Sequence, residues 1–179
     1  MNVIVRICQL LFLLVFGTIV HGQMPQGVGD WKVVEVSDAS KNSLHSNAVS
    51  WIATAFTSAN DVIQLNDKES GKIIVKGVSR YDAPAFKVGT NFSGYFSFML
   101  TIEVKENKYR YKFQNLNHSS DKNGYSGGSF DNEKPACGTF TLPKRNWVKI
   151  KSSGYDDIRS LSMNLENSIL QESSSDDDW

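Results

Sequence analysis

Residue types that act as nucleophiles, bases or metal ligands are sparse here, with three His and two Cys among 179 residues. Beyond the first 22 residues only His45, His118 and Cys137 remain. A Cys–His nucleophile pair needs both groups close together and a third group that orients the ring. Nothing near these residues supplies that arrangement, and one Cys with two scattered His lacks zinc spacing. We therefore predict no catalytic residue, no metal site and no cofactor. Cys137 is expected to be buried and inert, with pairing between molecules as the alternative.

Two acidic motifs have explanations in backbone structure. Asp121-Lys122-Asn123-Gly124 is similar to a calcium loop, but its Gly is fourth and the twelfth position is Asn132. An EF-hand needs Gly at about position 6 and Glu at about position 12. Asp67 and Glu69 might be paired acid–base carboxylates, but they precede Gly71 in a short turn, where Asp and Gly favour the backbone geometry. Neither motif predicts a site.

The N-terminal residues 1–22 have the pattern of a signal peptide. Arg6 supplies the positive charge, Leu10–Phe16 form the apolar centre, and Val20 and Gly22 fit the small sites before a cleavage point. We predict cleavage between Gly22 and Gln23 and a periplasmic or secreted protein. The apolar run is shorter than the roughly 20 residues of a spanning helix. No transmembrane segment is therefore expected after processing, and retention as an anchor is the alternative.

Composition limits the classes of partner. The 19 Lys and Arg balance 19 Asp and Glu, whereas surfaces that bind nucleic acid by bulk electrostatics carry a basic excess. We predict no nucleic-acid partner.

The length suits one domain, and two cysteines exclude a disulfide framework. Its predicted parts are a core at 31–116, a flexible loop at 117–145, a C-terminal helix within 146–171 and an acidic tail at 172–179.

Hydrophobic periodicity places the main elements of this domain. The core begins with a predicted strand at 31–36 and a helix at 40–58, whose apolar residues recur with helical period. The next predicted strands are 62–65, 72–76, 94–105 and 109–113, with a loop at 79–91 and a second helix at 156–171. Gly77 indicates a bulge or a close backbone approach.

The strands 94–105 and 109–113 predict a hairpin with one definite register. A two-residue turn at Glu106-Asn107 places Ile102 opposite Tyr111 on an apolar face. The same register places Glu103 opposite Arg110 on the polar face. Because one register satisfies both packing and charge, the pairing is well specified.

Several motifs carry a resemblance to a known family. These are Trp51-Ile52-Ala53 with Phe56, Val62-Ile63-Gln64, and the segment from Asp67 to Gly77. They resemble an exported bacterial domain of unknown function with a TATA-box-binding-protein (TBP)-like fold, over roughly Val33–Phe113. The resemblance implies a Gram-negative source and no assigned activity. It also implies the fold class that we predict: α+β, one curved antiparallel sheet of about five strands with helices packed on one face.

The sheet face away from the helices is the candidate site. Alternation assigns Met99, Thr101, Arg110 and Lys112 to it, with Ile74 and Lys76 as neighbours. This modestly basic mixture suits recognition of a protein or envelope component, although an ordinary solvated sheet face has a similar composition. The leading hypothesis is a non-enzymatic binding module. The alternatives are a structural or assembly component of the cell envelope, acting through a sheet edge or the acidic tail, and a hydrolase with His45 or His118 in a cleft.

Overall fold

The computed structural model describes residues 24–84, 91–121 and 124–173. The predicted signal peptide, its cleavage point and residues 174–179 of the predicted tail lie outside the described residues. Nine elements follow in chain order: β1 (Lys32–Glu35), α2 (Lys41–Ala55), α3 (Ala59–Val62), β2 (Ile63–Asp67), β3 (Lys72–Tyr81), β4 (Gly94–Lys105), β5 (Lys108–Ser120), β6 (Gly128–Ser129) and α4 (Lys144–Ser173).

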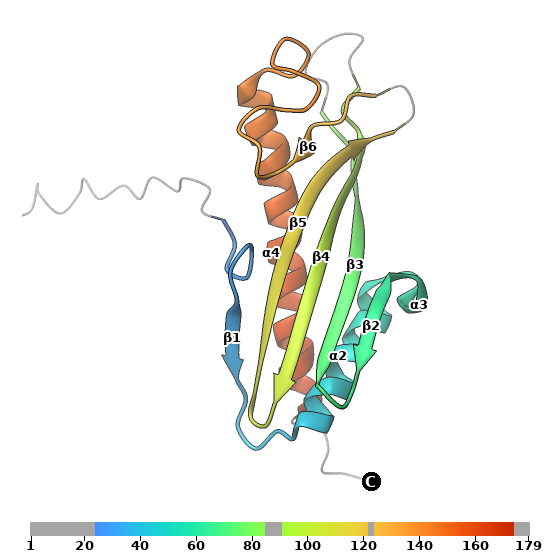
Figure 1. The fold of residues 1–179 in the computed structure, drawn as a ribbon, viewed down its shortest axis with the longest axis vertical. Coiled ribbons are helices and arrows are strands. Elements are labelled where there is room, and N and C mark those ends of the chain that lie inside the picture. Colours follow the sequence, from blue (N-terminus) through green and yellow to red (C-terminus); the bar gives the residue numbers. More distant parts are fainter. Residues whose placement is uncertain (1–23, 85–90, 122–123, 174–179) are drawn as a thin grey trace, which may run out of the picture.

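The strands form one open antiparallel sheet in the order β1-β5-β4-β3-β2, with the short β6 paired to β5. The long strands β3, β4 and β5 twist together, and α2 and α4 lie on the same side of them (Figure 1). No helix of the described residues lies on the opposite side of the sheet (Figure 1). The predicted α+β class, with an antiparallel sheet and helices on one face, is confirmed, and β6 adds a sixth strand to the five expected.

The hairpin of β4 and β5 has the predicted register. Ile102 pairs with Tyr111, and Glu103 pairs with Arg110. The turn is closed by Lys105 opposite Lys108, and Asn107 takes the left-handed conformation with φ 61°. Asn is among the residues that tolerate this conformation best. The Oδ1 atom of Asn107 also accepts a hydrogen bond from the backbone N–H of Ala39 at 3.1 Å, which ties the turn to the approach to α2.

The core forms between the helices and one face of the sheet. Leu100, Ile102 and Tyr111 are fully buried there, as the alternation of β4 and β5 predicts. Helix α2 begins where the Oγ atom of Ser40 accepts a hydrogen bond from the N–H of Ser43 at 3.0 Å, a normal N-cap. The buried residues of the two long helices, at helical spacing, are Leu44, Ala48, Trp51 and Ile52 on α2, and Trp147, Ile150, Ile158, Leu165 and Ile169 on α4.

Helix α4 is also joined to the first strand of the sheet by polar contacts. The Oε1 atom of Glu166 accepts hydrogen bonds from the Nζ of Lys32 at 2.6 Å and from the hydroxyl of Tyr111 at 2.5 Å. Burial, and then the hydrogen bond to Glu166, raise the pKa of Tyr111. The phenol therefore stays protonated and remains the donor.

The prediction of a flexible loop at 117–145 is wrong at both ends. Strand β5 continues to Ser120, β6 follows at Gly128–Ser129, and α4 begins at Lys144. A register shift between Ser97 and Met99, with Asn115 at φ 58°, interrupts the alternation that reveals a strand. After the irregularity the inward residues are Leu116 and His118, and the polar type of His118 conceals the buried face.

Two further predicted bounds are corrected, the start of the second helix and the end of the strand at 72–76, and one prediction about a glycine is confirmed. The second helix is predicted at 156–171, but α4 begins twelve residues earlier, at Lys144. Gly154 lies within the helix, and an isolated glycine weakens the helical signal of the sequence. A Cβ there would stand 2.6 Å from the Phe130 ring, so this glycine makes room for an aromatic contact. Strand β3 extends to Tyr81, into the expected loop at 79–91. For Gly77, the close approach is confirmed: a Cβ would stand 2.2 Å from Cζ of Phe98.

Candidate functional site

The candidate site is the sheet face without helices, which we call the open face. The register places Thr101 beside Lys112 and Glu103 beside Arg110, so the predicted residues lie together on this face. Met99 is half-buried and its sulfur accepts a hydrogen bond from the side chain of Gln114 at 3.5 Å. The prediction that Thr101 is presented to a partner is wrong, because only 6% of it is exposed. Its neighbours across the sheet are Ile74 and Lys112.

A charged network crosses three strands of the open face. The Nε and Nη2 atoms of Arg110 donate to Oε2 of Glu103 at 2.8 and 2.5 Å. The other carboxylate oxygen of Glu103 lies 3.4 Å from Nζ of Lys72. Partial burial opposes ionisation of Glu103, but hydrogen bonds from Arg110 and Lys72 outweigh it and lower its pKa. One carboxylate therefore neutralises part of the charge of two cations.

Trp31 is a member of this site that sequence reasoning missed. The guanidinium carbon of Arg110 lies 4.3 Å from the centre of the Trp31 ring, and Nζ of Lys112 lies 5.0 Å from it. Such distances are those of cation–π contacts. The strand containing Trp31 was predicted, but its position next to β5 depends on long-range pairing that no local pattern reveals. The pairing of Val33 with Arg110 sets that position.

The remainder of the open face repeats the combination of cations and aromatic rings. The guanidinium of Arg80 lies 5.2 Å from the Tyr95 ring and forms ion pairs with Asp82 and Asp121. The cross-strand register places the cations of β3, β4 and β5 on this face: Lys72, Lys76, Arg80, Lys105, Lys108, Arg110 and Lys112. Fewer acidic residues are cross-strand partners of these cations: Glu35, Asp67 and Glu103.

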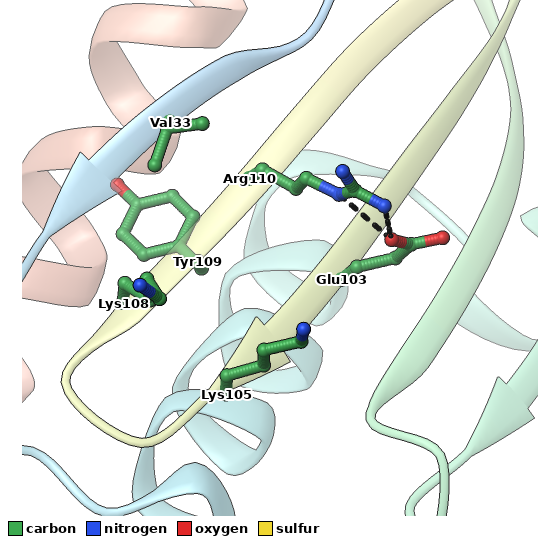
Figure 2. Close-up of a pocket in the computed structure, with 6 residues that line it drawn as sticks. All are labelled: Val33, Glu103, Lys105, Lys108, Tyr109 and Arg110. Carbon is green, nitrogen blue, oxygen red and sulfur yellow. Dashed lines mark hydrogen bonds and ion pairs between the residues drawn. The ribbon is translucent and has the colours of Figure 1, made fainter.

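A pocket of about 180 Å³ lies at the hairpin end of the open face. It is lined by Val33, Glu103, Lys105, Lys108, Tyr109 and Arg110. Figure 2 shows Arg110 turned toward Glu103, with Lys105 and Lys108 at the ends of their strands near the turn. We call this the hairpin-end pocket. Its walls combine ammonium groups with the apolar side chain of Val33, 55% of which is exposed.

Comparisons with known proteins identify the domain. Residues 31–119 match the model of the family described as a domain of unknown function (DUF4468) with TBP-like fold. The chain carries a DUF4468 domain. No curated protein matches.

Solved structures agree with this assignment. A TBP-like protein from Parabacteroides distasonis superposes with a TM-score of 0.57 at 13% identity, covering 78% of this chain and 90% of that one. A DUF4468 family protein from Bacteroides ovatus superposes with a TM-score of 0.53 at 10% identity, covering 78% and 84%. At these identities the likeness shows the fold alone.

Both histidines considered for catalysis are buried in the DUF4468 domain. The Nδ1 atom of His118 accepts a hydrogen bond from the N–H of Gly127 at 2.9 Å, so Nε2 carries the proton and donates to the Phe92 carbonyl at 2.8 Å. Burial lowers the pKa of His118. Burial first, and then the charges of nearby lysines, lower the pKa of His45 on α2. The ring of His118 therefore acts as a neutral cross-link between two backbone segments.

The remaining sequence candidates are accounted for by packing and by backbone structure. Cys137 is half-buried against the core, and burial raises the pKa of its thiol. Asp67 accepts hydrogen bonds from the N–H groups of Glu69 and Ser70, which is the turn role predicted for it. Within the described residues, no three His, Cys, Asp or Glu side chains group as metal ligands would. No described helix is both long and apolar enough to cross a membrane.

Proposed function

We propose that this DUF4468 protein is a non-enzymatic binding module, exported from the cell, that holds an acidic protein segment of the envelope on its open face. The N-terminal sequence supports export, since residues 1–22 have the composition of a signal peptide. The site supports binding over catalysis, because its groups are cations and aromatic rings. Such groups attract and orient an anionic partner, and the carboxylate of Glu103 among them is held by Arg110 and Lys72.

The observation that carries this proposal is the set of cations on the open face that lack an acidic partner. Among the described residues, Lys76, Lys105, Lys108 and Lys112 form no ion pair. Ordinary solvated faces intersperse both signs of charge, whereas one sign concentrated on a flat face steers partners of the opposite sign. The sign here favours a partner rich in Asp and Glu.

The aromatic groups add a second kind of contact. Trp31 is held by Arg110 and Lys112 at its ring face, so the position of the indole is fixed before a partner arrives. A preorganised aromatic group loses little conformational entropy on binding. A partner that alternates carboxylates with apolar residues would therefore meet both the cations and the ring. Because the contacts are exposed, binding should weaken steeply with salt.

The proposal is tested with an acidic peptide, polyglutamate, and two variants of equal charge change. Arg110→Glu with Lys112→Glu reverses charge on the open face, and Arg145→Glu with Lys149→Glu reverses it on the exposed side of α4. We expect the first variant to lose at least tenfold in affinity by calorimetry and the second to lose less than threefold. Equal losses in both variants would contradict the proposal. Because a new Glu beside Glu103 could disturb folding, Arg110→Gln with Lys112→Gln is measured as well.

A second function is favoured by the free edge of the sheet. Strand β2 pairs with β3 only from Lys72 to Val75, and from there to Tyr81 β3 has β4 on one side and no described strand on the other. Exposed strand edges are templates for pairing with another chain. A structural or assembly role through this edge predicts self-association, which sedimentation velocity measures across a hundredfold range of concentration. A monomer throughout that range would oppose this role.

A further inference from the structure

We propose that the hairpin-end pocket is the docking site of the chain's own acidic C-terminal segment, residues 174–179, and that this segment competes with the partner. The inference rests on the proposed function in one respect, since the pocket is part of the open face. The occupant, however, is a defined piece of this chain. Its binding can therefore be measured without any external partner.

The pocket presents positive charges at unusually close positions. Lys105 and Lys108 stand directly opposite each other across the hairpin, and like charges in that position destabilise a sheet. The nearby acids give little relief. Glu103 is bound to Arg110, and Glu106 accepts a hydrogen bond from the backbone N–H of Lys41 at 3.1 Å. Glu35 is opposite Lys108 in the register, but the two form no ion pair. An anion in the pocket would relieve this repulsion.

The C-terminal segment has the matching chemistry. Its sequence is Ser174-Ser175-Asp176-Asp177-Asp178-Trp179, and no other part of the chain has three consecutive acids. Three carboxylates suit the pocket, where Lys105 and Lys108 form no ion pair among the described residues and Arg110 is already paired with Glu103. The indole of Trp179 suits the exposed apolar wall at Val33. Charge and apolar character therefore agree between segment and pocket.

The length of the segment is sufficient to reach the pocket. Glu166 contacts Lys32, and α4 then continues seven residues to Ser173, or about 10 Å at 1.5 Å per residue. From Lys32, β1 runs three residues to Glu35, also about 10 Å. The end of α4 is thus level with the hairpin, as Figure 1 shows. Helix α4 and the pocket lie on opposite sides of the sheet (Figure 1), so the segment must pass around the turn of the hairpin. Six extended residues span up to about 20 Å, and about 10 Å of that span is used between packed layers.

Tethering makes this contact effective even when its intrinsic affinity is low. A segment on a short flexible linker has an effective concentration of about 1 mM. If the free peptide binds with a dissociation constant of about 0.1 mM, the tethered copy fills the pocket about ten times out of eleven. A competing acidic partner would then bind about tenfold more weakly.

The experiment titrates the peptide of residues 172–179, Glu-Ser-Ser-Ser-Asp-Asp-Asp-Trp, into the ¹⁵N-labelled protein. The unaltered protein is compared with the variant Asp176→Asn, Asp177→Asn, Asp178→Asn. We expect the variant to bind the peptide about tenfold more tightly, with amide shifts centred on Lys105, Lys108 and Arg110. Adding Lys105→Glu and Lys108→Glu to the variant should abolish binding. Adding Arg145→Glu and Lys149→Glu should not.

Three outcomes would overturn the inference. These are equal affinity in both proteins, no binding to the variant, and a difference that grows with protein concentration, which would mean docking on a second copy. The inference and the proposed function are contradicted by different results. Loss of polyglutamate binding with peptide binding intact would overturn the function alone. Loss of peptide binding with polyglutamate binding intact would overturn the inference alone.

Discussion

The guanidinium of Arg110 lies 4.3 Å from the centre of the Trp31 ring, and the same group donates two hydrogen bonds to Glu103. Arg110 therefore links the edge strand β1 to β4 across the open face. Lys112 lies against the same ring at 5.0 Å. The arrangement fixes two cations and one aromatic ring on the sheet face opposite α2 and α4 (Figure 1).

Replacing Trp31 by Ala should destabilise the fold modestly. Each cation–π contact at an exposed site contributes about 0.5–1 kcal/mol, so we expect a loss of about 1–2 kcal/mol in the free energy of unfolding. Trp31→Phe keeps an aromatic ring and should lose less. Urea denaturation followed by circular dichroism measures both. Equal losses for Ala and Phe would contradict a contribution from cation–π contacts, because Phe keeps a ring face for the two cations.

Replacing Gly77 by Ala tests the packing of the core under the sheet. The added Cβ would stand 2.2 Å from Cζ of Phe98, so the ring must move, and overpacking of this kind costs about 1–3 kcal/mol. Adding Phe98→Leu should recover part of the loss, because the smaller side chain leaves room. Lys76→Ala, exposed on the same strand, serves as the control. Strict additivity of the Gly77 and Phe98 changes in a double-mutant cycle would refute the contact.

Replacing Glu166 by Gln should weaken the attachment of α4 to the sheet. The change removes the charge that pairs with Lys32 and alters the acceptor for Tyr111, and hydrogen bonds to charged groups contribute about 1.5–3 kcal/mol. The pair is about a quarter exposed, so we expect the lower part of this range. Glu133→Gln, which breaks the exposed pair with Lys144, should cost clearly less, because solvent screens an exposed pair. Comparable losses in thermal unfolding would count against a special role for Glu166.

Stability should fall as the pH is lowered through the range of an ordinary histidine. Burial lowers the pKa of His118 below its usual 6.5. Between 6.5 and that lower value the unfolded chain binds a proton that the folded chain does not, so unfolding becomes easier with acid. Within that pH range, each such group changes the free energy of unfolding by up to about 1.4 kcal/mol per pH unit. Above pH 6.5 this contribution is complete and constant.

The variant His118→Gln checks this assignment, since Gln can donate and accept but does not titrate. Denaturant unfolding between pH 5 and 8 should give a flatter profile than that of the unaltered protein. His45 is also buried with a lowered pKa, so part of the slope should remain until His45→Gln is added. An unchanged profile in the double variant would place the pH dependence elsewhere.

The fold could be predicted where alternation is unbroken. Strand β4 has the predicted bounds, Gly94–Lys105, and the hairpin has the predicted register, because apolar and charged pairs agree on one alignment; β5 runs beyond the predicted 109–113 to Ser120. Beyond Asn115 the bulge and the inward His118 removed that signal, and a strand was taken for a loop. Gly154 concealed the first turns of α4 in the same way.

The candidate site could be predicted only in part. Alternation places Arg110 and Lys112 on the open face, because side chains of one strand follow a period of two. It does not reveal that Thr101 is covered by its neighbours or that Trp31 lies against the two cations. Both facts depend on which strands are adjacent. Pairing between segments about 80 residues apart is set by the whole fold.

Binding at the open face is the central claim, and an amide shift map of the ¹⁵N-labelled protein titrated with polyglutamate tests it most directly. We predict that the shifts gather on β3, β4 and β5, strongest around Lys76, Lys108 and Lys112, and that they fade when salt is raised to 0.5 M. Shifts confined to the exposed side of α4, or no shifts at millimolar peptide, would contradict the account.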